Sequence, residues 1–237
     1  MPTLADILAR LAAVPTTAAL LGLAATAGFL IIVADWRGSV LALAAQYLLA
    51  GLLLTRVIRP EIAMIKTLIG AMICLVLYIT ARRVGWVYSF LEVGERPSRF
   101  LLVLASGAPF RIMAALMALS LAYTAALRAP LSNVPSEVTF GVFTLGMMGV
   151  FNIALADEPL KGGMGLLTVI TGFELYYSSV EQSLIVVGLL GVVNFMIALA
   201  MSYLTTAQAT PPPAEESSLG PDSYQNTGLG PPGQGAL

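Results

Sequence analysis

The chain has 237 residues, of which 58% are apolar and 11% are charged, and its mean hydropathy is +0.87. A soluble domain carries about a quarter charged residues, so this composition indicates an integral membrane protein. The near balance of 12 basic and 13 acidic residues provides no basic surface for nucleic acid. Histidine is absent and Cys74 is the single cysteine, which excludes histidine-dependent triads, His- or Cys-ligated metal centres and intrachain disulfides.

Seven apolar windows follow one another along the chain, each close to the roughly 20 residues that a transmembrane helix requires. They are Thr16–Ala34, Ser39–Thr55, Ile62–Ala81, Phe110–Leu127, Val138–Ala156, Met164–Ser178 and Leu184–Leu204. Most of the polar connections between them are short, which predicts antiparallel neighbours. The sequence therefore predicts an all-α polytopic membrane helix bundle of about seven transmembrane helices.

This pattern divides the chain into three regions. Residues 1–137 form an N-terminal region of four helices, whose long loop at 82–109 carries aromatic residues and arginines and is expected to lie in the membrane interface. Residues 138–204 form a three-helix unit. Residues 205–237 contain six prolines, five glycines and no basic residue, which is typical of a disordered acidic tail.

The first apolar run has two interpretations. It contains the segment Ala-Ala-Thr-Ala and follows Arg10, a pattern that a cleaved signal peptide also shows. The run continues unbroken to Ala34 without a start rich in lysine or arginine. We therefore expect an uncleaved first span.

Basic residues in the connections predict the orientation, because they favour the cytoplasmic side of a membrane. One side carries seven of them: Arg37, Arg82, Arg83, Arg96, Arg99, Arg111 and Lys161. The other side carries four: Arg10, Arg56, Arg59 and Arg128. This asymmetry predicts an N-terminus outside and a C-terminus in the cytoplasm.

Glu174 is an ionisable residue inside a predicted span, where charge is costly and calls for a specific role. It follows Met164 by ten residues, about 15 Å along a helix, which places it near the middle of the membrane or somewhat beyond. Nearby Thr171, Tyr177 and Ser178 offer hydroxyl groups but no cation. A carboxyl group in that setting can exist protonated, as a proton relay requires. The alternative is a protonated Glu174 that only hydrogen-bonds neighbouring helices.

Other polar residues in the spans have simpler interpretations. Lys66 lies about a turn inside the third span, and its long stem favours snorkelling to the interface near Glu61. The alternative makes Lys66 a switchable cation beside a proton path. Gln46, Asn152 and Asn194 are neutral and are expected to form hydrogen bonds between helices.

The last three spans resemble a known family. The matching segments, in chain order, are Gly-Met-Met-Gly-Val-Phe-Asn from Gly146, Pro-Leu-Lys from Pro159, Gly-Phe-Glu-Leu from Gly172 and Val-Asn-Phe-Met from Val193. They are similar to the K subunit of respiratory complex I, the C subunit of Mrp-type sodium/proton antiporters and the C-terminal half of the E component of energy-converting membrane hydrogenases. In that family the middle helix carries Gly-Leu-Glu-Leu/Ile with its glutamate in the proton pathway, so the resemblance implies this role for Glu174. Where members often have a second glutamate on the last helix, this chain has Asn194.

The resemblance implies a non-catalytic membrane subunit of a complex I-like, hydrogenase-like or Mrp antiporter-like assembly that translocates protons or sodium. Glu174, Asn194 and Lys66 are the pathway residues that we predict. The implied partners are other membrane subunits and the lipid bilayer of a prokaryotic inner or plasma membrane. We expect no cofactor and no active site in the chain itself. The complex to which it belongs can nevertheless be a membrane oxidoreductase.

Two alternative functions stay open at this stage. The chain is a stand-alone transporter or channel if Glu174 is itself a substrate or proton site. It is a structural or assembly protein if the acidic tail at 205–237 serves to recruit a partner.

Overall fold

The computed structural model describes residues 15–33, 35–58, 60–91, 108–131, 134–156, 158–180 and 183–209. Seven α-helices occupy these ranges: α2 (Thr16–Ile32), α3 (Trp36–Leu54), α4 (Pro60–Leu91), α6 (Ala108–Arg128), α7 (Ser136–Ala154), α8 (Pro159–Val180) and α9 (Leu184–Ala209). Each predicted apolar window coincides with one helix. The predicted all-α fold is confirmed.

Five of these helices are long and apolar enough to cross a membrane. The segments are Trp36–Leu54, Ile62–Val84, Pro109–Arg128, Ser136–Ala154 and Ile185–Gln208. α2 is apolar but has only 17 residues, and the 22 residues of α8 include Lys161, Glu174 and several glycines. These five helices indicate an integral membrane protein. That α2 and α8 also cross the membrane stays a prediction.

Local sequence sets several helix starts. The side chain of Asp35 accepts a hydrogen bond from the backbone N–H of Arg37 at 3.3 Å, which caps α3. Pro60 and Pro159 are the first residues of α4 and α8, where the missing N–H of proline breaks no helical hydrogen bond.

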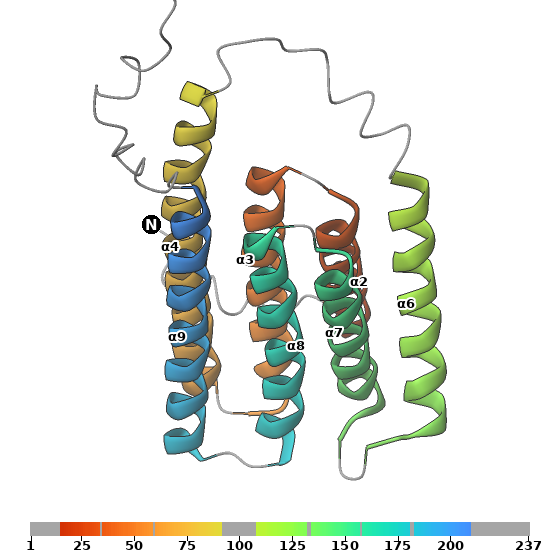
Figure 1. Ribbon diagram of the computed structural model, residues 1–237. Helices are drawn as coiled ribbons and strands as arrows, with labels where there is room; N and C mark the ends of the chain where they lie inside the picture. The colour runs from red at the N-terminus through yellow and green to blue at the C-terminus, as the bar shows by residue number, and fades with distance from the viewer. Residues whose placement is uncertain are drawn as a thin grey trace, which may run out of the picture.

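The helices stack in two layers of three (Figure 1). α2, α3 and α4 form one layer, α7, α8 and α9 form the other, and α6 stands at the edge against α2 and α7. Across the layers, α2 packs on α7, α3 on α8 and α4 on α9, and the helices of each facing pair run in the same direction (Figure 1). The two layers therefore have the same order and the same directions of their three helices. No repeat in the sequence indicated this. The regions predicted at 1–137 and 138–204 are packed into a single bundle.

Three helices extend well beyond their predicted windows, and one of them is α8, which begins at Pro159 rather than at Met164. α4 has 32 residues and ends at Leu91, so it continues through the start of the loop predicted at 82–109. The loop residues 92–107 lie outside the described ranges, and their interfacial placement stays a prediction. α9 ends at Ala209 rather than near residue 204, since no glycine or proline occurs between residue 204 and Pro211. Residues 210–237 of the predicted tail also lie outside the described ranges.

Glycines allow α7 and α8 to approach each other closely. A Cβ atom at Gly149 would lie 2.8 Å from the backbone nitrogen of Val169, and one at Gly165 would lie 2.9 Å from that of Ile153. Backbone atoms cannot retreat as the end of a flexible side chain can, so these positions require glycine. Such contacts between small residues are a common source of helix association in membranes.

We expect Gly149→Ala and Gly165→Ala to lower the free energy of unfolding by about 1–3 kcal/mol each, the usual range for overpacking. Gly146→Ala is the matched control on α7, because a Cβ atom there meets nothing within 4 Å. The measurement is reversible unfolding in mixed micelles. Equal stability of all three variants would contradict the close contact between α7 and α8.

Candidate functional site

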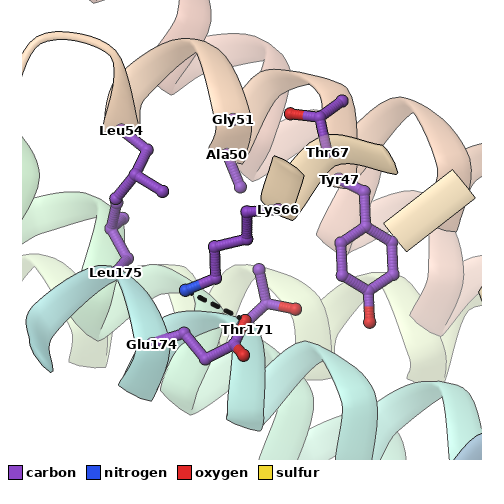
Figure 2. A pocket seen from close by; sticks show the side chains of 9 residues that line it. All are labelled: Tyr47, Ala50, Gly51, Leu54, Lys66, Thr67, Thr171, Glu174 and Leu175. Carbon is purple, nitrogen blue, oxygen red and sulfur yellow. Dashed lines mark ion pairs between the residues drawn. The ribbon is translucent and has the colours of Figure 1, made fainter. Parts of the chain in front are cut away.

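An ion pair joins α4 to α8 in the interior of the bundle (Figure 2). Lys66 Nζ lies 3.3 Å from Glu174 Oε2 and donates a hydrogen bond to Ser178 Oγ at 3.4 Å. The side chain of Glu174 is 2% exposed and that of Lys66 is 12% exposed. α4 and α8 both pack on α3 and on α9, so the pair crosses the middle of a four-helix unit formed by α3, α4, α8 and α9.

The carboxylate of this pair is only partly satisfied. Two unit charges 3.3 Å apart attract each other by about 5 kcal/mol at an effective dielectric constant of about 20, while removing each ion from water costs several kcal/mol. Glu174 Oε1 is buried and has no hydrogen-bond partner among the described groups. A buried pair that lacks these additional bonds gains little from remaining charged. The attraction between the two charges therefore offsets the cost of burying them only in part.

A small pocket lies beside the pair, between α3, α4 and α8 (Figure 2). Its lining residues are Tyr47, Ala50, Gly51, Leu54, Lys66, Thr67, Thr171, Glu174 and Leu175. Its volume is about 20 Å³, which is sufficient for one water molecule. Leu54 is the last residue of α3, so the pocket lies in the half of the bundle where α3 connects to α4.

Two glycines bring α3 and α4 together around this pocket. A Cβ atom at Gly51 would collide with Thr67 Oγ1, and one at Gly70 would lie 2.7 Å from the ring of Tyr47. This close approach places Lys66 and Tyr47 in walls of the same pocket.

The threonine hydroxyls of the pocket already have acceptors. Thr67 Oγ1 donates to the carbonyl of Ala63 at 2.9 Å, and Thr171 Oγ1 donates to that of Leu167 at 2.7 Å. Their oxygen lone pairs stay available to a hydrogen-bond donor in the pocket. The polar wall therefore suits an ammonium group or a water molecule.

The structure brings together only some of the residues that the sequence singled out. The expectation that Lys66 snorkels to the interface is wrong, because its ammonium finds a carboxylate on another helix. Asn194 is buried, at 2% exposure, but it does not line the pocket. The side-chain oxygens of Gln46 and Asn194 have no hydrogen-bond partner in the described part of the chain, so they do not form the interhelical bonds that we expected.

Tyr47 is a further residue of the site and was not among the residues predicted from the sequence. It is 6% exposed and lines the pocket together with Glu174. A tyrosine in an apolar span resembles any interfacial or packing aromatic, and only the neighbouring Gly70 on α4 shows that its ring is enclosed. The sequence contains no signal that distinguishes it.

No protein-family model, curated protein or solved structure matches the chain. The resemblance of residues 138–204 to the K-subunit family stays a prediction from the sequence motifs.

We expect the ion pair to show strong coupling in a double-mutant cycle. Lys66→Met or Glu174→Leu alone leaves an unpaired buried group and lowers the free energy of unfolding by about 3–5 kcal/mol. The double variant replaces the pair by apolar side chains and is expected to be as stable as the wild type or more so. Unfolding of all four proteins in mixed micelles measures the coupling, and additive effects would contradict a direct interaction.

Proposed function

We propose that this chain is a non-catalytic membrane subunit of an ion-translocating assembly, in which Glu174 and Lys66 form a proton-transfer pair. The observation that carries the proposal is a buried, incompletely hydrogen-bonded ion pair inside a membrane bundle. Passage of one proton from Lys66 Nζ to Glu174 Oε2, which lie 3.3 Å apart, converts the charged pair into a neutral one. A proton that arrives at one partner can then leave from the other, and the pair returns to its starting state.

The distribution of charge favours a subunit over a complete transporter. Glu174 is the one buried acidic side chain in the described ranges. A path across about 30 Å of hydrocarbon needs further groups that exchange protons, and Asn194 cannot titrate. We propose that other membrane subunits supply these groups, as the resemblance to the K-subunit family implies. The chain itself then requires no cofactor.

We also propose that all seven helices span the membrane, with the N-terminus outside and the C-terminus in the cytoplasm. Five basic residues lie near the end of the bundle that the C-terminus of α9 reaches: Arg37, Arg82, Arg83, Arg111 and Lys161. Arg56 and Arg128 lie toward the opposite end. This asymmetry supports a cytoplasmic C-terminus, and a C-terminal reporter active only outside the cell would contradict it.

The proposal is tested with Glu174→Gln in the assembled complex. Glutamine keeps the size and most of the hydrogen bonding of glutamate but cannot titrate. We expect the complex still to assemble, at lower stability because Lys66 loses its counter-charge. Coupled proton or sodium movement is expected to fall about 10²-fold, since a positioned proton-transfer group contributes that much or more. Ion movement is measured in membrane vesicles.

Glu137→Gln is the matched control, because Glu137 is exposed in the first turn of α7. It is expected to leave ion movement unchanged. Normal ion movement in an assembled Glu174→Gln complex would disprove the proton-transfer role.

The purified chain alone separates a subunit from a stand-alone transporter. We expect no ion flux when the full-length chain is reconstituted in proteoliposomes, since it supplies only one buried proton-exchanging pair. Ion flux that depends on Glu174 in this preparation would support the stand-alone transporter instead.

A further inference from the structure

We infer that the pocket beside the ion pair binds one water molecule and not Na⁺, so that the ion relayed by Lys66 and Glu174 is a proton. The conclusion about the relayed ion rests on the proposed function, in which either protons or sodium ions move. The binding of water is a property of this chain and is tested separately.

Two side chains in the lining of this pocket carry a buried polar atom that has no hydrogen-bond partner among the described groups. These atoms are Glu174 Oε1, which is an acceptor, and the hydroxyl oxygen of Tyr47, which can donate and accept. Glu174 is 2% exposed and Tyr47 is 6% exposed. Buried polar atoms are nearly always hydrogen-bonded, either to protein or to an ordered water molecule. An ordered water in the pocket is therefore the partner that these atoms call for.

The other polar groups of the lining can also bond to a water molecule. Of the three N–H groups of the Lys66 ammonium, two are accounted for by Glu174 Oε2 at 3.3 Å and by Ser178 Oγ at 3.4 Å. The third can donate to a water molecule. Thr67 and Thr171 offer oxygen lone pairs, because their hydroxyl hydrogens are bonded to backbone carbonyls. The pocket therefore presents both donors and acceptors.

The size of the pocket fits a single water molecule. A buried water needs a cavity of at least about 10–15 Å³ and two to four polar partners. This pocket has a volume of about 20 Å³ and five polar side chains in its lining. A water molecule can accept from the ammonium and donate to the carboxylate at the same time, so it strengthens a pair that is otherwise incompletely hydrogen-bonded.

Charge and space both disfavour Na⁺ in the same pocket. Hard cations are bound by oxygen ligands, carboxylates above all. The carboxylate of Glu174 is already neutralised by the ammonium 3.3 Å away, and no other acidic side chain is buried in the described ranges. Na⁺ would therefore add an uncompensated positive charge, which is costly in an apolar interior. If Lys66 released its proton first, the space of one water molecule would still leave no room for hydration water around the ion.

A bound water gives the proposed proton transfer a second route. An acid and a base can exchange a proton directly or through one water molecule. Lys66 gives a proton to the water while the water gives one of its own to Glu174, so one N–H bond and one O–H bond of water break. A new O–H bond of water and the O–H bond of the carboxyl group form, and the water is regenerated. Na⁺ cannot use this route.

Nuclear Overhauser measurements on the full-length chain in micelles test the water site. Ala50 lines the pocket, whereas Ala118 has zero exposure and lies in the apolar core on α6. The alanine methyl groups are labelled with ¹³C, and the two signals are assigned by their loss in Ala50→Gly and Ala118→Gly. We expect a cross peak with the sign of a bound water at the Ala50 methyl group and no cross peak at that of Ala118.

The hydroxyl of Thr67 can imitate this signal if its proton exchanges with water, because it lies against α3 at Gly51. Thr67→Val removes this hydroxyl and keeps the shape of the side chain. We expect the cross peak at Ala50 to persist in Thr67→Val, since Lys66 and Glu174 still hold the water. Absence of the peak in the wild type, or its loss in Thr67→Val, would overturn the water site.

Binding of Na⁺ is tested on the same full-length chain, because a ligand that binds the folded state raises stability. Unfolding in micelles is compared in NaCl and in choline chloride at the same concentration. We expect equal unfolding equilibrium constants in the two salts. A lower constant in NaCl that becomes equal in Glu174→Gln would place Na⁺ at the carboxylate and overturn the inference.

The two proposals fail in different ways. If Na⁺ binds at Glu174 and Glu174→Gln abolishes ion movement, the relay stands but carries sodium, and the inference is wrong. If the pocket holds water and Glu174→Gln moves ions normally, the water site is real but the pair does not relay protons.

Discussion

A charged side chain buried inside a membrane bundle needs an oppositely charged partner that is also buried. The Lys66–Glu174 pair meets this requirement, and it fixes how α4 and α8 lie relative to each other. Both helices pack on α3 and α9, and the reach of the Lys66 side chain connects them across the middle of the four-helix unit. Gly51 on α3 and Gly70 on α4 let these two helices approach each other closely. This approach places Lys66 beside α3, from where its side chain extends to Glu174. The pocket, the threonine hydroxyls and the enclosed ring of Tyr47 are all consequences of this arrangement.

The two layers of the bundle depend on each other through the same interaction. Lys66 belongs to the layer of α2, α3 and α4, whereas Glu174 belongs to the layer of α7, α8 and α9 (Figure 1). The described residues of α2, α3 and α4 include no buried acidic side chain, and Lys161, the buried cation in the layer of Glu174, precedes it on the same helix by 13 residues. Separation of the layers would leave an ammonium and a carboxylate unpaired in an apolar environment, which is strongly unfavourable. The ion pair therefore favours correct stacking of two layers that have the same topology.

The helices were predictable because the requirement for about 20 apolar residues acts locally along the chain. The importance of Glu174 was predictable for the same reason, since a carboxyl group in such a window has no local compensation. The partner of Glu174 was not predictable, because Lys66 lies in a different layer and the stacking of the layers leaves no repeat in the sequence. Its position near a helix start favoured snorkelling, and only the tertiary arrangement shows that a carboxylate lies within reach. The extra turns of α4 and α9 were missed because apolar windows measure the membrane core and not the full helix.

The departure at Asn194 gains a physical interpretation from the pair. The predicted resemblance of residues 138–204 implies a family whose members often have two intramembrane glutamates. Two nearby carboxylates titrate one after the other because both resist being charged together. In the proposed function, the ammonium of Lys66 takes the place of the second acid as the second titratable group. A pair of opposite charges is neutral overall in both of its proton arrangements, so it can stay buried without a counter-ion from water. In the proposed function, a proton added to this pair makes it cationic, and that unfavourable charge favours release to the next acceptor.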